Sequence, residues 1–89
     1  MYMSRLALNP NRRETMRALA EPQLLHGAIE SAFPGAKERK LWRIDWLKDV
    51  CWLLIISANE PILKDIQQQF GFPTSQFAGE SRDYLSPAN

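Results

Sequence analysis

The sequence has little of what disulfide-stabilised, metal-binding and membrane proteins require. It contains one cysteine, Cys51, and one histidine, His26, so it can form no disulfide within the chain and no Cys/His zinc cluster. No apolar run approaches the roughly 20 residues of a membrane-spanning helix, and the first five residues do not open a signal peptide. The four glycines are scattered rather than gathered in a ligand-binding loop. We therefore expect a cytoplasmic protein without membrane association, metal or cofactor.

Composition favours one small folded domain. The chain has 89 residues, of which 45% are hydrophobic and 24% charged, which is ordinary for a globular protein with a core. The net charge of +1 does not by itself indicate a nucleic-acid partner. Residues 1–20, however, hold four arginines against one glutamate. Three of these arginines could hold a phosphate backbone or could form a solvated face: Arg12, Arg13 and Arg17.

Strand and helix patterns follow each other in the first part of the chain. Residues 2–8 alternate between two faces and predict a strand. Residues 12–20 predict a short helix with Met16 and Leu19 turned inward and its arginines outward. A proline then separates this helix from a second helical piece, residues 22–33.

Residues 41–56 predict a hairpin of two strands. Residues 41–47 alternate, and their apolar face consists of Trp42, Ile44 and Trp46. Residues 50–56 are apolar at every position, which predicts a strand covered along most of its length. The intervening Lys48-Asp49 suits a tight reversal.

A further helix follows the hairpin. Asn59 and Pro61 are suitable first residues, Gly71 is a suitable stop, and the apolar stripe is Ile62, Ile66 and Phe70. The order strand, helix, hairpin, helix predicts an α+β, ferredoxin-like (split βαβ) fold with three clear antiparallel strands and two helical regions.

That fold needs a fourth strand beside the first. Residues 72–89 contain no convincing strand, and only Tyr84-Leu85 hints at one. We therefore predict a ferredoxin-like domain over residues 1–71 and an irregular tail over residues 72–89, with the fourth strand missing or a stub. The edge of the first strand would then be open to self-association.

The candidate functional residue is His26. It lies about 100° round the helix from Leu25, whose apolar stripe continues through Ala28, Ile29, Ala32 and Phe33. Gln23 and Glu30, three residues before and four after, share the strip of His26, and Gly27 would allow a ligand close to the backbone. Local pattern alone favours a surface histidine paired with Glu30.

Several stretches together suggest a family. They are MYMSRLALNP at residues 1–10, His26, Phe33-Pro34, KLWRID at residues 40–45, and LLIIS at residues 53–57 leading to Glu60-Pro61. In this order and spacing they resemble the amino-terminal part of CasE-type proteins (Cse3 family), the CRISPR repeat endoribonucleases of type I-E systems.

The resemblance implies the first of two tandem ferredoxin-like domains. Such proteins bind the stem-loop of the CRISPR repeat and cut precursor RNA on its 3′ side without metal, by attack of a ribose 2′-hydroxyl. The resemblance also implies a role in antiviral defence, with repeat RNA and the subunits of the type I-E surveillance complex as partners. The family's catalytic histidine corresponds to His26. The second domain and its glycine-rich loop do not occur in these 89 residues, so we expect the chain alone to be inactive or weakly active.

The residues around His26 fit this chemistry in part. An imidazole has an ordinary pKa of about 6.5 and can take or give a proton at neutral pH. Glu30 would fix its tautomer and favour its protonated form. Gln23 stands where better-known family members have a tyrosine, and it can hydrogen-bond but not exchange a proton. Phosphate could be positioned, or developing charge stabilised, by Arg12, Arg13 or Arg17.

Two other functions stay open from sequence alone. One is a non-catalytic module that holds RNA or a complex subunit, suggested by Gln23 and the absent second domain. The other is a ferredoxin-like regulatory domain that binds a small ligand and dimerises through its open edge. We interpret the single cysteine and the three tryptophans as core packing: Cys51, Trp42, Trp46 and Trp52.

Overall fold

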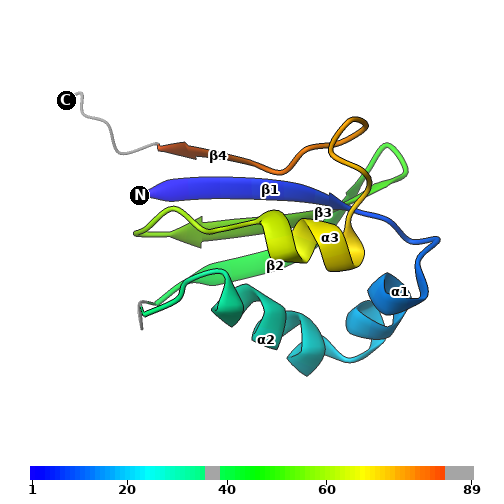
Figure 1. The fold of residues 1–89 in the computed structure, drawn as a ribbon, viewed down its shortest axis with the longest axis horizontal. Helices are drawn as coiled ribbons and strands as arrows, with labels where there is room; N and C mark the ends of the chain where they lie inside the picture. The colour runs from blue at the N-terminus through cyan, green and yellow to red at the C-terminus, as the bar shows by residue number, and fades with distance from the viewer. Residues whose placement is uncertain (36–38, 84–89) are drawn as a thin grey trace.

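The computed structural model describes residues 1–35 and 39–83, which form a four-stranded antiparallel sheet and three helices (Figure 1). The strand order is β2-β3-β1-β4. This order and the alternation along the chain are those of a ferredoxin-like fold, so the predicted fold class is confirmed. The elements are β1 (Tyr2–Leu8), α1 (Arg13–Ala20), α2 (Pro22–Ser31), β2 (Leu41–Leu47), β3 (Val50–Ser57), α3 (Lys64–Phe70) and β4 (Glu80–Asp83).

The hairpin of β2 and β3 forms as predicted, and its burial shows where the core lies. Lys48 and Asp49 have φ values of 51° and 66°, as the two central residues of a type I′ turn require. Alternate residues of β3, beginning with Cys51, are buried against the helices, while those between them are only half-buried. The helices therefore pack on one face of β3, and its other face is only partly covered.

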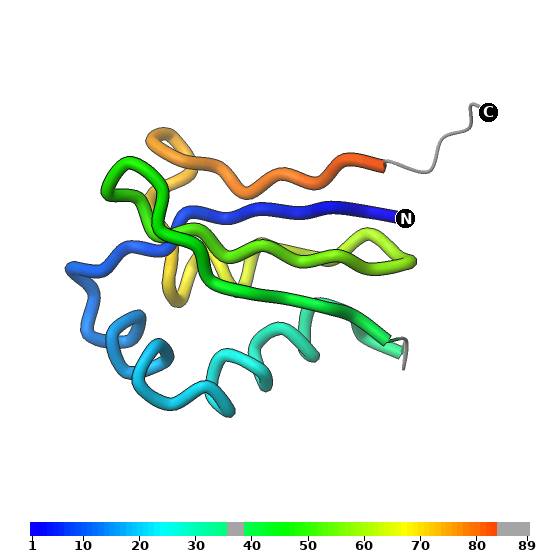
Figure 2. Tube along the Cα trace, turned by 180° about the vertical axis from the view of Figure 1, so that it is seen from behind, coloured from blue at the N-terminus to red at the C-terminus, as the bar shows by residue number. Residues whose placement is uncertain are grey.

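The fourth strand is present, which corrects the prediction that it is missing or a stub. Glu80–Asp83 pair antiparallel with Tyr2–Arg5, and Figure 2 shows β4 running beside the N-terminal half of β1. Two side-chain contacts support the ladder: Arg5 Nε to Glu80 Oε2 at 2.6 Å and Ser4 Oγ to Ser81 Oγ at 2.8 Å. All four residues of β4 are polar, so hydrophobic alternation could not reveal it. Tyr84-Leu85 lies outside the described residues.

Because β4 covers β1, self-association through an open first-strand edge loses its structural basis. The edge strands of the described sheet are instead β2 and the short, charged β4, and charged side chains on an edge disfavour pairing with other chains.

Gln67 directs the chain from α3 into β4. Its side chain is buried, its Nε2 donates to the carbonyls of Phe72 and Phe77, and its Oε1 accepts from the backbone N–H of Gly79 at 2.8 Å. A Cβ on Gly79 would lie 2.6 Å from Leu6 Cδ1. Gly79 therefore lets this segment pass close to β1, and Gln67 holds it there.

The helix α1 turns only part of its predicted face to the core, because Leu19 packs partly buried against the core and Met16 does not. Met16 is 52% exposed, whereas Thr15 and Ala18 are buried. Thr15 Oγ1 donates a hydrogen bond to the carbonyl of Phe70 at 2.9 Å, and the same carbonyl, at the end of α3, also accepts from the backbone N–H of Asn9 at 2.7 Å. The polar contact outweighs the apolar pattern of the helix.

The helix α3 begins later than predicted. It starts at Lys64 rather than near Asn59 or Pro61, and Ile62, expected in its apolar stripe, is 49% exposed. The backbone N–H of Ile62 instead donates to the carbonyl of Ala32 at 2.9 Å. This contact satisfies a carbonyl at the end of α2 and ties the residues before α3 to that helix.

The three tryptophans do not all belong to the core. Trp42 packs partly buried against it, but Trp46 is 56% exposed, so its prediction as a core residue is wrong. Trp46 lies on an edge strand one residue from the end of β2, and both views place the hairpin turn apart from α1 (Figures 1 and 2). Trp52 lies on the sheet face away from the helices, edge-to-face with Phe77 and 4.8 Å from the Arg5 guanidinium.

Candidate active site on helix α2

Two buried residues fix the orientation of α2. Leu25 and Ile29 are 2% and 0% exposed and anchor one stripe of the helix in the core. Pro22 stands in the first turn, where its missing N–H costs nothing. With this stripe inward, the next residue round the helix, His26, faces solvent with 60% of its side chain exposed. The apolar stripe of the helix predicted this placement.

His26 is paired with Glu30. Its Nε2 lies 3.1 Å from Glu30 Oε2, the i, i+4 contact that helical spacing predicts. Hydrogen bonds from Lys40 and then from His26 lower the pKa of the Glu30 carboxyl below its usual value, so Glu30 is ionised at neutral pH. An ionised carboxylate only accepts hydrogen bonds. His26 Nε2 therefore carries the proton, and in the neutral ring the lone pair lies on Nδ1.

The surface beside His26 is open. A Cβ built on Gly27 would meet no atom within 4 Å, which leaves room for a ligand to approach the helix backbone. Gln23 is exposed one turn earlier, and among the described residues its side chain makes no hydrogen bond. The arrangement thus brings together His26 and Glu30 but does not join Gln23 to them.

Lys40 is the residue that sequence reasoning missed. Its Nζ donates to Glu30 Oε1 at 3.2 Å, and its side chain is 5% exposed. Lys40 precedes β2, ten residues after Glu30, so only the packing of β2 beside α2 brings the two together. The sequence showed it as part of a charged approach to a strand, with no periodicity to signal this contact.

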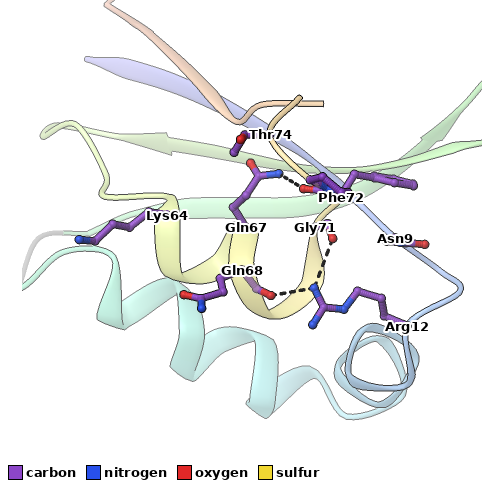
Figure 3. A pocket seen from close by; sticks show the side chains of 9 residues that line it. Asn9, Arg12, Lys64, Gln67, Gln68, Gly71, Phe72 and Thr74 are labelled. Carbon is purple, nitrogen blue, oxygen red and sulfur yellow. Dashed lines mark hydrogen bonds between the residues drawn. The ribbon is translucent and has the colours of Figure 1, made fainter. Parts of the chain in front are cut away.

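The three arginines have different surroundings. Arg12 Nη1 donates to the carbonyls of Gln68 at 2.7 Å and Gly71 at 3.4 Å, so it caps the end of α3 (Figure 3). Arg17 Nε lies 3.8 Å from Glu21 Oε2 and is largely exposed. Arg13 is exposed, and its side chain makes no hydrogen bond or ion pair within the described part of the chain.

A hollow beside Arg12 lies between the start of α1 and the end of α3 (Figure 3). His26 is not among the residues that line it, so this hollow and the His26 site are separate. Over residues 1–35 and 39–83, no three His, Cys, Asp or Glu side chains lie together in a way that could hold a metal ion. The helices of the same ranges are too short or too polar to cross a membrane.

The fold and the site define a ferredoxin-like domain that presents a histidine–carboxylate pair on its helical layer. A family model described as CRISPR associated protein matches residues 1–88, so the chain belongs to that family and, within it, to the CasE-type (Cse3) proteins.

A solved structure of the CRISPR endoribonuclease Cse3 bound to a 19-nucleotide RNA is similar to this chain, with 26% sequence identity and a TM-score of 0.73. The match covers 99% of this chain and 44% of that one, so the chain spans less than half the length of that Cse3. A comparison with curated proteins found no match.

Proposed function

We propose that this chain is the histidine-bearing, amino-terminal part of an endoribonuclease that binds precursor CRISPR RNA and cuts it within the repeat. The observation that carries the proposal is the exposed His26, hydrogen-bonded to an ionised Glu30 on a chain of the CasE type. The similar Cse3 structure is that of an endoribonuclease with RNA bound, which supports RNA as the substrate class.

The proposed reaction is a transesterification. A ribose 2′-oxygen loses its proton and forms a bond to the neighbouring phosphorus, the bond from phosphorus to the 5′-oxygen breaks, and that oxygen gains a proton. The products are a 2′,3′-cyclic phosphate and a 5′-hydroxyl. The neutral His26 ring offers Nδ1 to accept the first proton, and the protonated ring can donate the second. Either role typically contributes about 10²- to 10⁴-fold in rate.

The arginines are proposed phosphate contacts. Arg13 is the strongest candidate, because no other described residue engages its side chain, and Arg17 has only a long ion pair with Glu21. Arg12 is already held by two carbonyls, so its contribution to RNA binding would come from charge rather than from a free guanidinium. Such contacts position the RNA but carry no base specificity.

The test uses the natural full-length protein that contains this sequence, incubated with repeat RNA in EDTA. We expect cleavage that ends in a cyclic phosphate, and we expect a single 2′-deoxy substitution at the cut site to abolish it. Cleavage of the 2′-deoxy RNA at the normal rate would refute 2′-hydroxyl attack. Cleavage only on addition of a divalent metal would refute the metal-independent mechanism.

A second candidate function is a non-catalytic module that holds repeat RNA or a subunit of the surveillance complex. Gln23 favours it, because this position on the exposed strip of His26 cannot exchange a proton. The same experiment separates the two candidates: RNA that is bound tightly but never cut in the absence of metal would support the second.

A further inference from the structure

Lys40 is a buried cation on the edge of the proposed active site. Its side chain is 5% exposed, and its Nζ lies 5.0 Å from the ring centroid of Phe33, itself a core residue just beyond α2. A lysine ammonium so far removed from water requires a negative partner and favours a site next to an aromatic face. Glu30 Oε1, at 3.2 Å, is such a partner.

The Glu30 carboxylate is therefore held at both oxygens. Oε1 accepts from Lys40 and Oε2 accepts from His26 Nε2. Glu30 and His26 alone would form a half-exposed i, i+4 pair, and pairs of that kind are weak and leave long side chains free to move. The contact with Lys40 changes this, because a carboxylate held at both oxygens has less freedom to rotate than one held at a single oxygen.

We infer that Lys40 is a positioning residue of the site: through Glu30 it holds the His26 ring with Nε2 inward and Nδ1 toward the substrate. The inference rests on the proposed function for its catalytic meaning, but the contact chain from Lys40 to His26 can be tested without RNA. Lys40 acts through Glu30 rather than on RNA, because its covered side chain offers almost no surface to a ligand.

The first measurement follows the Glu30 carboxyl carbon by NMR as pH is changed. In the parent protein its pKa is lowered by Lys40 more than by His26. Lys40→Met keeps the aliphatic stem but removes the charge, and it should raise the Glu30 pKa toward its usual value. His26→Ala should raise it less. Lys64→Met, which removes the same charge from the exposed start of α3, is the control and should leave it unchanged.

The second measurement is a double-mutant cycle on single-turnover cleavage by the full-length protein. Lys40→Met and Glu30→Gln should each slow cleavage by about tenfold, the scale of a small misplacement of a catalytic group. The double variant should be no slower than Glu30→Gln alone, because both changes break one chain of contacts. Lys40→Arg should recover most of the rate, and RNA affinity should stay within about twofold of the parent in every variant.

The two measurements separate failure of this inference from failure of the proposed function. An unchanged Glu30 titration in Lys40→Met, or additive losses in the cycle, would overturn the role of Lys40 while leaving RNA cleavage intact. A protein that never cuts RNA would refute the proposed function, and the carboxyl titration would still decide whether Lys40 holds Glu30. If Lys40→Met does not fold, Lys40→Gln removes the charge with a polar end and takes its place in both measurements.

Discussion

Replacing Gln67 with methionine should destabilise the fold far more than its place in a glutamine-rich helix suggests. Methionine keeps the length of the side chain and its helix propensity but removes every hydrogen bond to the segment that leads into β4. In these bonds the Gln67 side chain donates to the carbonyls of Phe72 and Phe77 and accepts from the N–H of Gly79. At about 1 kcal/mol net for each bond, and with some rescue by water at these half-buried groups, the loss is about 2–3 kcal/mol.

That loss is a large part of the unfolding free energy expected for a domain of this size, a few to about 12 kcal/mol. It corresponds to a melting temperature lower by roughly 10–20 °C. Urea and thermal unfolding of Gln67→Met measure it. Hydrogen exchange should also become faster in β4 and in the N-terminal half of β1, because these strands depend on each other. The control is Gln69→Met, an exposed position on the same helix. A difference under about 0.5 kcal/mol in unfolding free energy between the two variants would show that Gln67 does not hold this segment.

Three further predictions concern individual side chains. Arg12→Met should destabilise the protein by about 1 kcal/mol through loss of the α3 cap. Arg13→Met should leave urea stability unchanged and reduce the salt dependence of RNA binding by about one counterion. Equal urea stability of the two variants would contradict the capping role. Burial raises the pKa of the Cys51 thiol, so a thiol reagent should modify it only at the rate of unfolding, and fast labelling of native protein would contradict its placement. Lys40, and then His26, lower the folded-state pKa of Glu30. The ion pairs of Glu30 should therefore stabilise the protein above the carboxyl's usual pKa, and this stabilisation should be lost as pH falls through the lowered value. The stability deficit of Lys40→Met should accordingly shrink on acidification, and a deficit that grows would contradict this sign.

The fold was largely predictable because apolar periodicity specifies most of it. β1 and β2 have the predicted bounds, and α2 presents His26 to solvent as its stripe of Leu25 and Ile29 requires. In each of these elements the residue pattern and the tertiary packing agree, which is the condition under which local sequence reasoning succeeds.

The remaining parts depend on polar contacts between distant residues, which periodicity does not report. β4 has no apolar residue and relies on Gln67 and on pairing with β1. The face of α1 is chosen by Thr15, whose hydroxyl meets a carbonyl 55 residues away. Lys40 joins the site only because β2 packs beside α2. The histidine–carboxylate pair was predictable from helical spacing, but the cation that holds it was not.

The role of His26 in proton transfer during RNA cleavage carries the proposed function. The most direct measurement is single-turnover cleavage of repeat RNA in EDTA by the full-length His26→Ala protein, with RNA affinity measured in parallel. Proton transfer by His26 predicts a rate at least about 100-fold below the parent with nearly unchanged affinity. A His26→Ala protein that cuts as fast as the parent would contradict it.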